Sequence, residues 1–147
     1  MADFDAIVVG AGCAGSVAAY ELAKAGKSVL VVERGNYAGA KNMTGGRIYS
    51  HALKLVFPNF EEEAPLERRI THERISLMSD DANFTIDFSS KAMKQEGRDS
   101  YSVLRGPFDQ WLAGKAEEAG AEFHFATTAE YIIMQDGAVA GLVASDA

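Results

Sequence analysis

Cysteine, proline and clustered positive charge are all scarce in this sequence. Its 147 residues include one Cys and three Pro, which excludes an internal disulfide, a structural zinc site or an iron–sulfur cluster built from this chain alone. Lys and Arg number 14 against 21 Asp and Glu, for a net charge of −7, and the basic residues stand beside acids. Nucleic acid is therefore not an expected partner, and the lone cysteine fits a reducing compartment.

Long apolar runs are missing as well. Glu21, Lys24 and Lys27 interrupt the most apolar region, so no run approaches the roughly 18 residues of a membrane-spanning helix. Asp3 and Asp5 stand where a secretory signal would carry basic residues. We therefore expect no transmembrane segment and a cytoplasmic location. The length and the 48% hydrophobic content predict a folded globular unit with a core.

The first third of the chain contains a strand–helix–strand pattern. Residues 5–9 form a short β-branched run, typical of a buried parallel strand. Small and apolar residues then recur at helical spacing over residues 13–25, and Gly26 ends the pattern. Residues 28–32 form a second apolar run that closes on Glu33. The segment has the size of a βαβ unit.

A G-x-G-x-x-G motif joins the first strand to the helix. Gly10 permits the sharp turn, Gly12 lets the backbone approach a pyrophosphate, and Gly15 lets the helix pack close to the strand. The helix N-terminus supplies free N–H groups and positive partial charge for a diphosphate. Glu33 ends the next strand near the expected spacing, where it can accept hydrogen bonds from a ribose and would repel the 2′-phosphate of NADP. The motif leaves FAD and NAD open, and a tight turn without ligand is the plain alternative.

The remaining pattern predicts further elements around a glycine-rich stretch at residues 34–47, which is too long for a plain connector. Alternating residues after Ile70 indicate antiparallel strands joined around Asp80 and Asp81. The other expected elements are a helix at 50–57, an acidic turn at 59–65, a strand at 101–105, a helix from Pro107 to Gly120, a strand at 121–125, and a hairpin of 131–134 with 139–143 turning on Asp136 and Gly137.

Longer motifs give the chain a family resemblance. They lie at residues 4–16, 33–35, 39–47, 64–68 and 101–112. On these motifs the chain resembles FixC-type flavoproteins, relatives of electron-transfer flavoprotein:quinone oxidoreductase in the geranylgeranyl reductase superfamily. The resemblance implies a Rossmann-like α/β fold and non-covalently bound FAD, with Gly10, Gly12, Gly15, Glu33 and Arg34 around the ADP half; Cys13 and Ala14 lie within the same glycine motif.

The resemblance also implies residues for the flavin half of FAD. It places the loop of residues 41–47 near the flavin ring, with Lys41, Asn42, Gly45 and Gly46 as candidates, and Arg105 resembles a family arginine that contacts FAD. From the residues alone, the loop could be a mobile surface segment, and Arg105 could simply pair with a carboxylate.

No side chain is singled out for catalysis or for binding a metal. Asp109 is expected to stabilise a helix dipole. Cys13 is expected to serve packing, although a helix N-terminus would favour its thiolate. His51, His72 and His124 share no metal-ligand spacing.

The family pattern continues beyond the motifs present in this sequence. We therefore expect residues 1–147 to be the N-terminal part of an FAD-binding domain, incomplete by itself, with the strands at about 70–100 belonging to a substrate domain. The resemblance implies electron-transfer flavoprotein, a ferredoxin-like protein, and a quinone or polyprenyl acceptor as partners. The alternatives are a nucleotide-binding module without turnover and the NAD-binding domain of a dehydrogenase.

Overall fold

The computed structural model describes residues 3–95 and 98–147, and the chain forms two compact units. The first unit joins the segment up to Thr44 to the segment from Arg105 onward, and the second comprises residues 45–104. Each unit has its own sheets. The mixed α/β class predicted from the sequence is confirmed.

A parallel sheet forms the centre of the first unit. It consists of β1 (Ala6–Val9), β2 (Val29–Val32) and β8 (Glu122–His124), in the order β1-β2-β8. Ala6 pairs with Val29, and Leu30 pairs with Glu122. The predicted βαβ unit is therefore present. The two strands that flank β2, β1 and β8, come from distant parts of the sequence.

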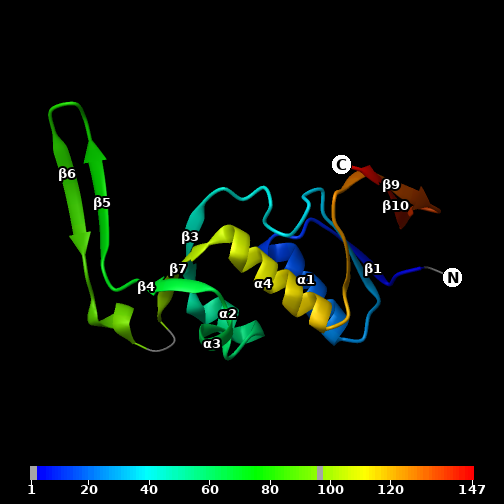
Figure 1. Cartoon of the computed structure of the whole chain (residues 1–147), viewed down its shortest axis with the longest axis horizontal. Coiled ribbons are helices and arrows are strands. Elements are labelled where there is room, and N and C mark those ends of the chain that lie inside the picture. The colour runs from blue at the N-terminus through cyan, green and yellow to red at the C-terminus, as the bar shows by residue number, and fades with distance from the viewer. Residues whose placement is uncertain (1–2, 96–97) are drawn as a thin grey trace. The chain divides into compact units, whose positions relative to one another are not determined.

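Two helices pack together beside this sheet, α1 (Cys13–Lys24) and α4 (Arg105–Glu118) (Figure 1). Their shared core is built largely from alanines, with Ala19 and Ala116 fully buried next to Val29 and Val31 of β2. Such small side chains allow a close approach between helix backbones. The helix predicted from Pro107 begins two residues earlier, so Pro107 lies in its first turn, where proline is tolerated.

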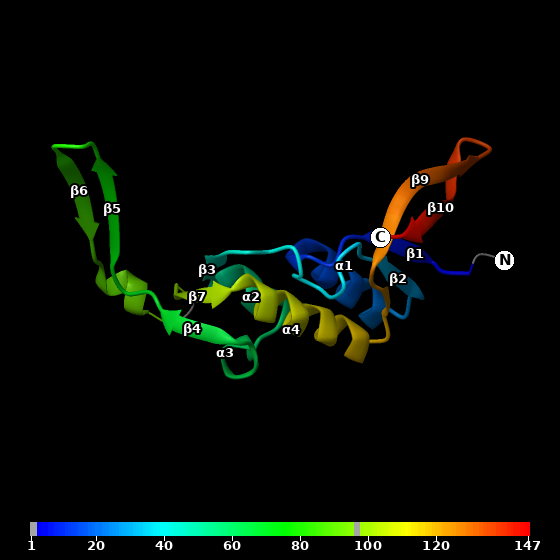
Figure 2. The same ribbon diagram turned by 45° about the horizontal axis from the view of Figure 1, so that its top comes forward.

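A long hairpin completes the first unit. Strands β9 (Thr127–Gln135) and β10 (Ala138–Asp146) pair antiparallel and form a curved ribbon (Figure 2). Asp136 and Gly137 connect them with φ angles of 50° and 78°, as in the mirror-image turns that suit hairpins. The predicted hairpin is confirmed, with longer arms than expected.

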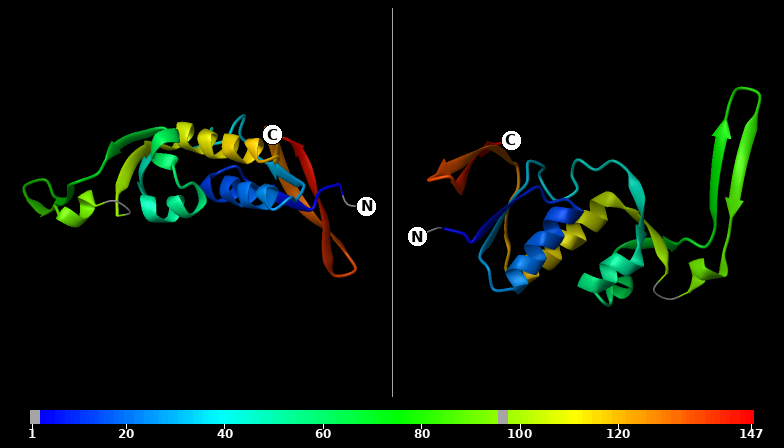
Figure 3. Two further views of the ribbon diagram at one scale, coloured as in Figure 1. Left: turned by 90° about the horizontal axis from the view of Figure 1, so that it is seen from below. Right: turned by 180° about the vertical axis from the view of Figure 1, so that it is seen from behind.

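The second unit contains a three-stranded antiparallel sheet in the order β3-β7-β4. The strands are β3 (Gly45–Tyr49), β7 (Ser100–Leu104) and β4 (Leu66–Arg69), with helices α2 (Ser50–Val56) and α3 (Phe60–Glu63) between β3 and β4 (Figure 3). Phe60 is fully buried and meets the ring of Tyr101 edge-on. A short 3-10 helix spans Lys91–Lys94.

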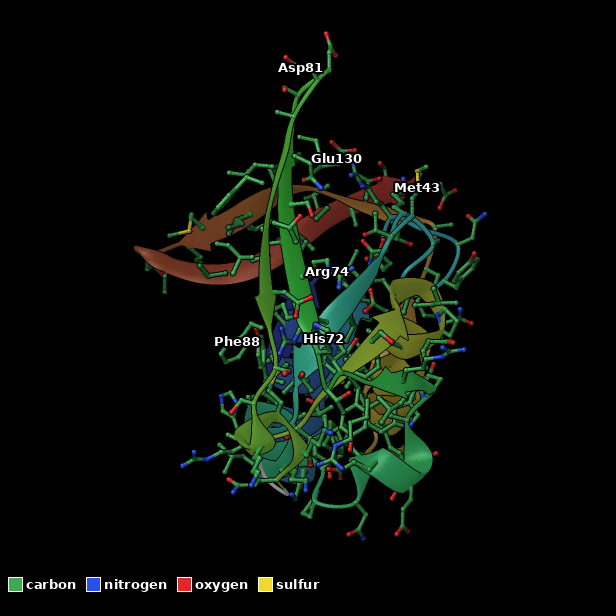
Figure 4. All side chains as sticks on the ribbon, turned by 90° about the vertical axis from the view of Figure 1, so that its left-hand side faces the viewer. Met43, His72, Arg74, Asp81, Phe88 and Glu130 are labelled. Atoms are coloured by element: carbon green, nitrogen blue, oxygen red, sulfur yellow. The ribbon has the colours of Figure 1, made fainter. Side chains whose placement is uncertain are left out.

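A two-stranded hairpin, β5 (Glu73–Met78) with β6 (Asn83–Phe88), belongs to the same unit. Its strand alternation matches the prediction, and Figure 4 shows Asp81 at its turn. One face carries the ion pair of Arg74 with Asp87, and the other carries the apolar pairs Ile75 with Ile86 and Leu77 with Phe84. Each of these four apolar residues has more than half of its surface exposed to solvent.

Two local predictions need correction. The acidic stretch expected as a turn is the helix α3, because its three glutamates stand in the first turn, where the helix dipole favours negative charge. The glycine-rich stretch is shorter than expected, because Gly45, Gly46 and Arg47 already pair with β7. Residues 96 and 97, inside the expected substrate-domain segment, lie outside the described residues. Within the described chain, no helix combines the length and apolar character needed to cross a membrane.

Candidate functional site

The glycine motif lies where β1 ends and α1 begins. Gly10 has φ of +97°, a conformation that side chains of L-residues rarely adopt. A Cβ atom at Gly15 would lie 1.9 Å from the carbonyl oxygen of Gly10 and 3.3 Å from Cγ1 of Val8. Gly15 is therefore required for the close contact between helix and strand, as the sequence predicted.

Gly12 has a different environment. It is the N-cap residue of α1, with extended backbone angles, and a Cβ atom placed on it would meet nothing within 4 Å. Among the described residues, no side chain caps this helix, and its first turn holds no acid. The first N–H groups of a helix have no partners inside the helix and carry positive partial charge. The backbone next to Gly12 is thus both uncovered and suited to an anion; that a diphosphate binds there stays a prediction.

Glu33 binds the glycine motif directly. Its Oε2 accepts a hydrogen bond from the backbone N–H of Ala11 at 2.8 Å, and its Oε1 accepts one from Gly35 at 2.6 Å. The Glu33 side chain therefore lies against the turn between β1 and α1, and it also fixes the segment that leaves β2. Each carboxylate oxygen has a further lone pair for a ligand hydroxyl.

A hollow of about 260 Å³ opens at the carboxyl ends of the parallel strands β1 and β2. It is lined by Val9, Gly10, Val32, Glu33, Arg34 and the first residues of β9, Thr127, Thr128 and Ala129. The backbone N–H of Thr127 donates to the carbonyl oxygen of Glu33 at 2.9 Å, which fixes β9 at this edge. Ligands of open α/β sheets bind at such strand ends. Sequence reasoning missed the three β9 residues, because only tertiary structure brings them to Glu33.

A buried carboxylate organises a second part of the first unit. Asp109 of α4 has a fully buried side chain and accepts hydrogen bonds from Arg105, Cys13 and Asn42. We refer to these four residues as the Asp109 cluster. The expectation that Asp109 stabilises the helix dipole from the first turn is therefore wrong, because α4 begins at Arg105 and its first turn holds no acid. The alternative for Arg105, pairing with a carboxylate, is also seen, although its side chain stays one-third exposed.

Electrostatics within the Asp109 cluster agree with the expectation that Cys13 serves packing and not nucleophilic chemistry. Burial, followed by the hydrogen bond and the negative charge of Asp109, raises the pKa of the Cys13 thiol to about 11. The helix N-terminus does not prevail over these effects, so the thiol is protonated at neutral pH. The hydrogen bonds that Arg105 itself donates to Asp109 raise the pKa of Arg105, which keeps its positive charge.

The predicted site residues fall into two groups. The first unit holds Gly10, Gly12, Cys13, Ala14, Gly15, Glu33, Arg34, Lys41, Asn42 and Arg105. Gly45 and Gly46 belong to β3 of the second unit, where a Cβ atom at Gly45 would lie 2.7 Å from the carbonyl oxygen of Val103. Close pairing with β7 thus gives Gly45 a structural reason of its own. Lys41 directly precedes Asn42 in the same loop, and its side chain is exposed.

The chemistry available here is binding through backbone groups. Over the described residues, no group of three or more His, Cys, Asp or Glu side chains is arranged for a metal ion. The three histidines lie on separate segments, with His51 in α2, His72 just before β5 and His124 in β8. The uncovered helix start, the carboxylate beside it and the hollow at the strand ends together fit a dinucleotide such as FAD.

Comparison with known proteins supports this assignment. A family model described as FAD dependent oxidoreductase matches residues 5–95. Protein FixC of Salmonella typhi is 51% identical over 96% of the chain, and a protein of Escherichia coli named probable electron transfer flavoprotein-quinone oxidoreductase is 47% identical over 97%. A crystal structure of a geranylgeranyl bacteriochlorophyll reductase-like protein from Thermoplasma acidophilum matches with a TM-score of 0.79 at 26% identity, over 97% of this chain and 35% of its own.

These matches confirm the resemblance inferred from the sequence motifs, and the family description confirms FAD in place of NAD. The chain spans 33% of the length of each of the two relatives matched by sequence.

Proposed function

This chain belongs to the FAD dependent oxidoreductase family, and from that premise we propose that it binds FAD without a covalent bond, as part of a FixC-type oxidoreductase that passes electrons through the flavin. One observation carries the proposal. The Glu33 carboxylate is hydrogen-bonded to Ala11 inside the glycine motif, beside a helix start that the Gly12 backbone leaves uncovered.

The ADP half of FAD is assigned to the first unit. The backbone of Gly10, Gly12 and the first turn of α1 would hold the pyrophosphate, with Cys13, Ala14 and Gly15 contributing N–H groups. The hydroxyl groups of the adenosine ribose would donate hydrogen bonds to the Glu33 carboxylate. Arg34 and the start of β9 border the hollow in which the adenosine would lie.

The flavin half is assigned to Lys41, Asn42 and Arg105 of the first unit. Arg105 keeps a positive charge and one-third of its side chain exposed, so it can still donate to a phosphate or to a flavin oxygen while it is paired with Asp109. Asn42 and Arg105 both hydrogen-bond to Asp109, which sets them side by side in the first unit.

When bound, FAD supplies the electron-transfer chemistry, and the polypeptide supplies binding, orientation and electrostatics. No catalytic side chain is assigned in this chain. The names of the relatives point to electron transfer. We assign electron-transfer flavoprotein and a ferredoxin-like protein as protein partners, and a quinone or polyprenyl compound as the small-molecule acceptor.

The proposal is tested by the colour and the ligand response of the purified protein. We expect flavin absorbance near one FAD per chain, and a thermal shift with FAD that NAD and NADP do not match, because a ligand that binds the folded state raises its stability. Gly12→Val should remove FAD binding and leave the folded apoprotein intact, because the added Cβ meets no protein atom within 4 Å.

Gly114→Val in α4 is the matched control, because Gly114 also has no neighbour within 4 Å of an added Cβ atom. This variant should keep FAD. Equal FAD affinity in Gly12→Val and wild type would contradict the placement of the pyrophosphate. If the protein bound FAD but no electron donor reduced the flavin, the chain would be a nucleotide-binding module and not an enzyme.

A further inference from the structure

Three segments far apart in the sequence meet at one buried carboxylate. Cys13 comes from the start of α1, Asn42 from the loop after β2, and Arg105 from the start of α4. Cys13 donates to Oδ1 of Asp109 at 3.1 Å, and Arg105 donates from Nε and Nη2 to the two oxygens at 3.0 Å each. The amide of Asn42 donates to Oδ2.

The burial of Asp109 excludes direct contact with a ligand. Its side chain is fully buried, and each carboxylate oxygen already accepts two donors. A buried carboxylate is costly unless it is paired and hydrogen-bonded. The arrangement meets that requirement and leaves no face of Asp109 open for FAD.

A simple helix ion pair does not account for this arrangement. Arg105 and Asp109 stand four residues apart on α4, and exposed pairs at this spacing contribute little. Such a pair needs neither burial nor donors from two other segments. Gly39 packs closely against α4: a Cβ atom added to it would lie 3.0 Å from Cβ of Asp109 and 3.1 Å from Cα of Gly106. This contact also fixes the loop that carries Asn42 against the start of α4.

We propose that Asp109 is a positioning residue for the dinucleotide site: its carboxylate holds Arg105 and Asn42 in the orientation that receives FAD and fixes the start of α1 through Cys13. This inference rests on the proposed FAD function. Asp109 itself does not touch the cofactor. Asp109 restricts Arg105, Asn42 and the first turn of α1 before FAD binds. Binding therefore costs less conformational entropy.

The variant Asp109→Asn tests this role, because it keeps the shape and removes the charge. Arg105 and Asn42 lose charge-assisted hydrogen bonds, so FAD should bind about tenfold more weakly or worse. The comparison is made by titrating the apoprotein with FAD and following flavin fluorescence. Glu118→Gln is the matched control, because it makes the same chemical change at an exposed position on the same helix, and it should bind FAD as wild type does.

A second measurement does not depend on FAD. Cys13 is the single cysteine of the chain, and Asp109 helps to keep its thiol protonated. Alkylation of the apoprotein by iodoacetamide near pH 8.5 should be faster in Asp109→Asn than in wild type or Glu118→Gln. If Asp109→Asn is alkylated faster than wild type but the wild-type protein binds no FAD, the proposed function is refuted and the Asp109 cluster stands.

The positioning role is wrong if folded Asp109→Asn binds FAD with wild-type affinity, whatever its stability, because Asp109 would then only support the fold. Should this variant not fold, Cys13→Ser and Cys13→Ala replace it. Serine keeps a donor to Asp109 and should retain FAD affinity, whereas alanine removes the donor and should weaken binding. Equal affinity in these two variants would also overturn the proposal.

Discussion

The contact between Gly15 and β1 offers a direct test of the helix–strand geometry. In Gly15→Ala the new Cβ would lie 1.9 Å from the Gly10 carbonyl oxygen and 3.1 Å from the Gly10 carbonyl carbon. These are backbone atoms, which cannot swing away as a long side chain can. The start of α1 must therefore move away from β1 by about 1 Å or more to restore ordinary packing.

The expected magnitude follows from two opposing effects. Overpacking of a close contact costs about 1–3 kcal/mol, whereas replacing glycine with alanine inside a helix favours the helix by up to about 1 kcal/mol. The packing cost prevails, and we expect a net loss of about 1–2 kcal/mol in the free energy of unfolding. For a chain of this size that lowers the melting temperature by about 2–8 °C.

Urea unfolding of the apoprotein, followed by circular dichroism, measures this loss. Gly114→Ala is the control, because its Cβ meets nothing within 4 Å in α4, and it should be as stable as wild type or more stable. Gly15→Ala should also bind FAD more weakly, because the N-terminus of α1 is displaced. If Gly15→Ala were as stable as Gly114→Ala, the close approach of α1 to β1 would be refuted.

Two further predictions concern Glu33 and Cys13. In Glu33→Gln one carboxylate oxygen becomes an NH₂ group, so the backbone N–H of Ala11 or Gly35 loses its acceptor. Urea unfolding should show that the free energy of unfolding falls by about 1–3 kcal/mol. An unchanged midpoint would contradict these hydrogen bonds. The pKa of Cys13 is raised from 9.0 to about 11, so the folded state keeps a proton that the unfolded chain releases. Stability due to this group therefore falls as the pH rises from about 9 to about 11, and the difference between wild type and Cys13→Ser over that pH range should show it; parallel curves for the two proteins would contradict the raised pKa.

Local sequence determined the elements around the glycine motif. The β-branched run, the helical spacing after Cys13 and the closing Glu33 predicted β1, α1 and β2 to within one or two residues, because each pattern reflects short-range geometry and burial. The Asp-Gly turn of the last hairpin was equally readable, since positive φ is a property of the residues in the turn. The acidic helix α3 was missed, because a run of three glutamates is compatible with a solvated turn as well as with a helix start.

Tertiary structure alone decided how the site is supported. The sequence places Cys13, Asn42 and Asp109 up to 96 positions apart, and no periodicity or spacing connects them. The packing of α1 against α4 brings Cys13 to Asp109, and the contact of Gly39 with Asp109 and Gly106 brings the loop of Asn42 there. Only the pairing of β8 with β2 carries the start of β9 to Glu33. Burial, which outweighs the effect of the helix N-terminus on the Cys13 thiol and raises its pKa, is likewise a property of the folded neighbourhood, because desolvation depends on every segment that covers a group.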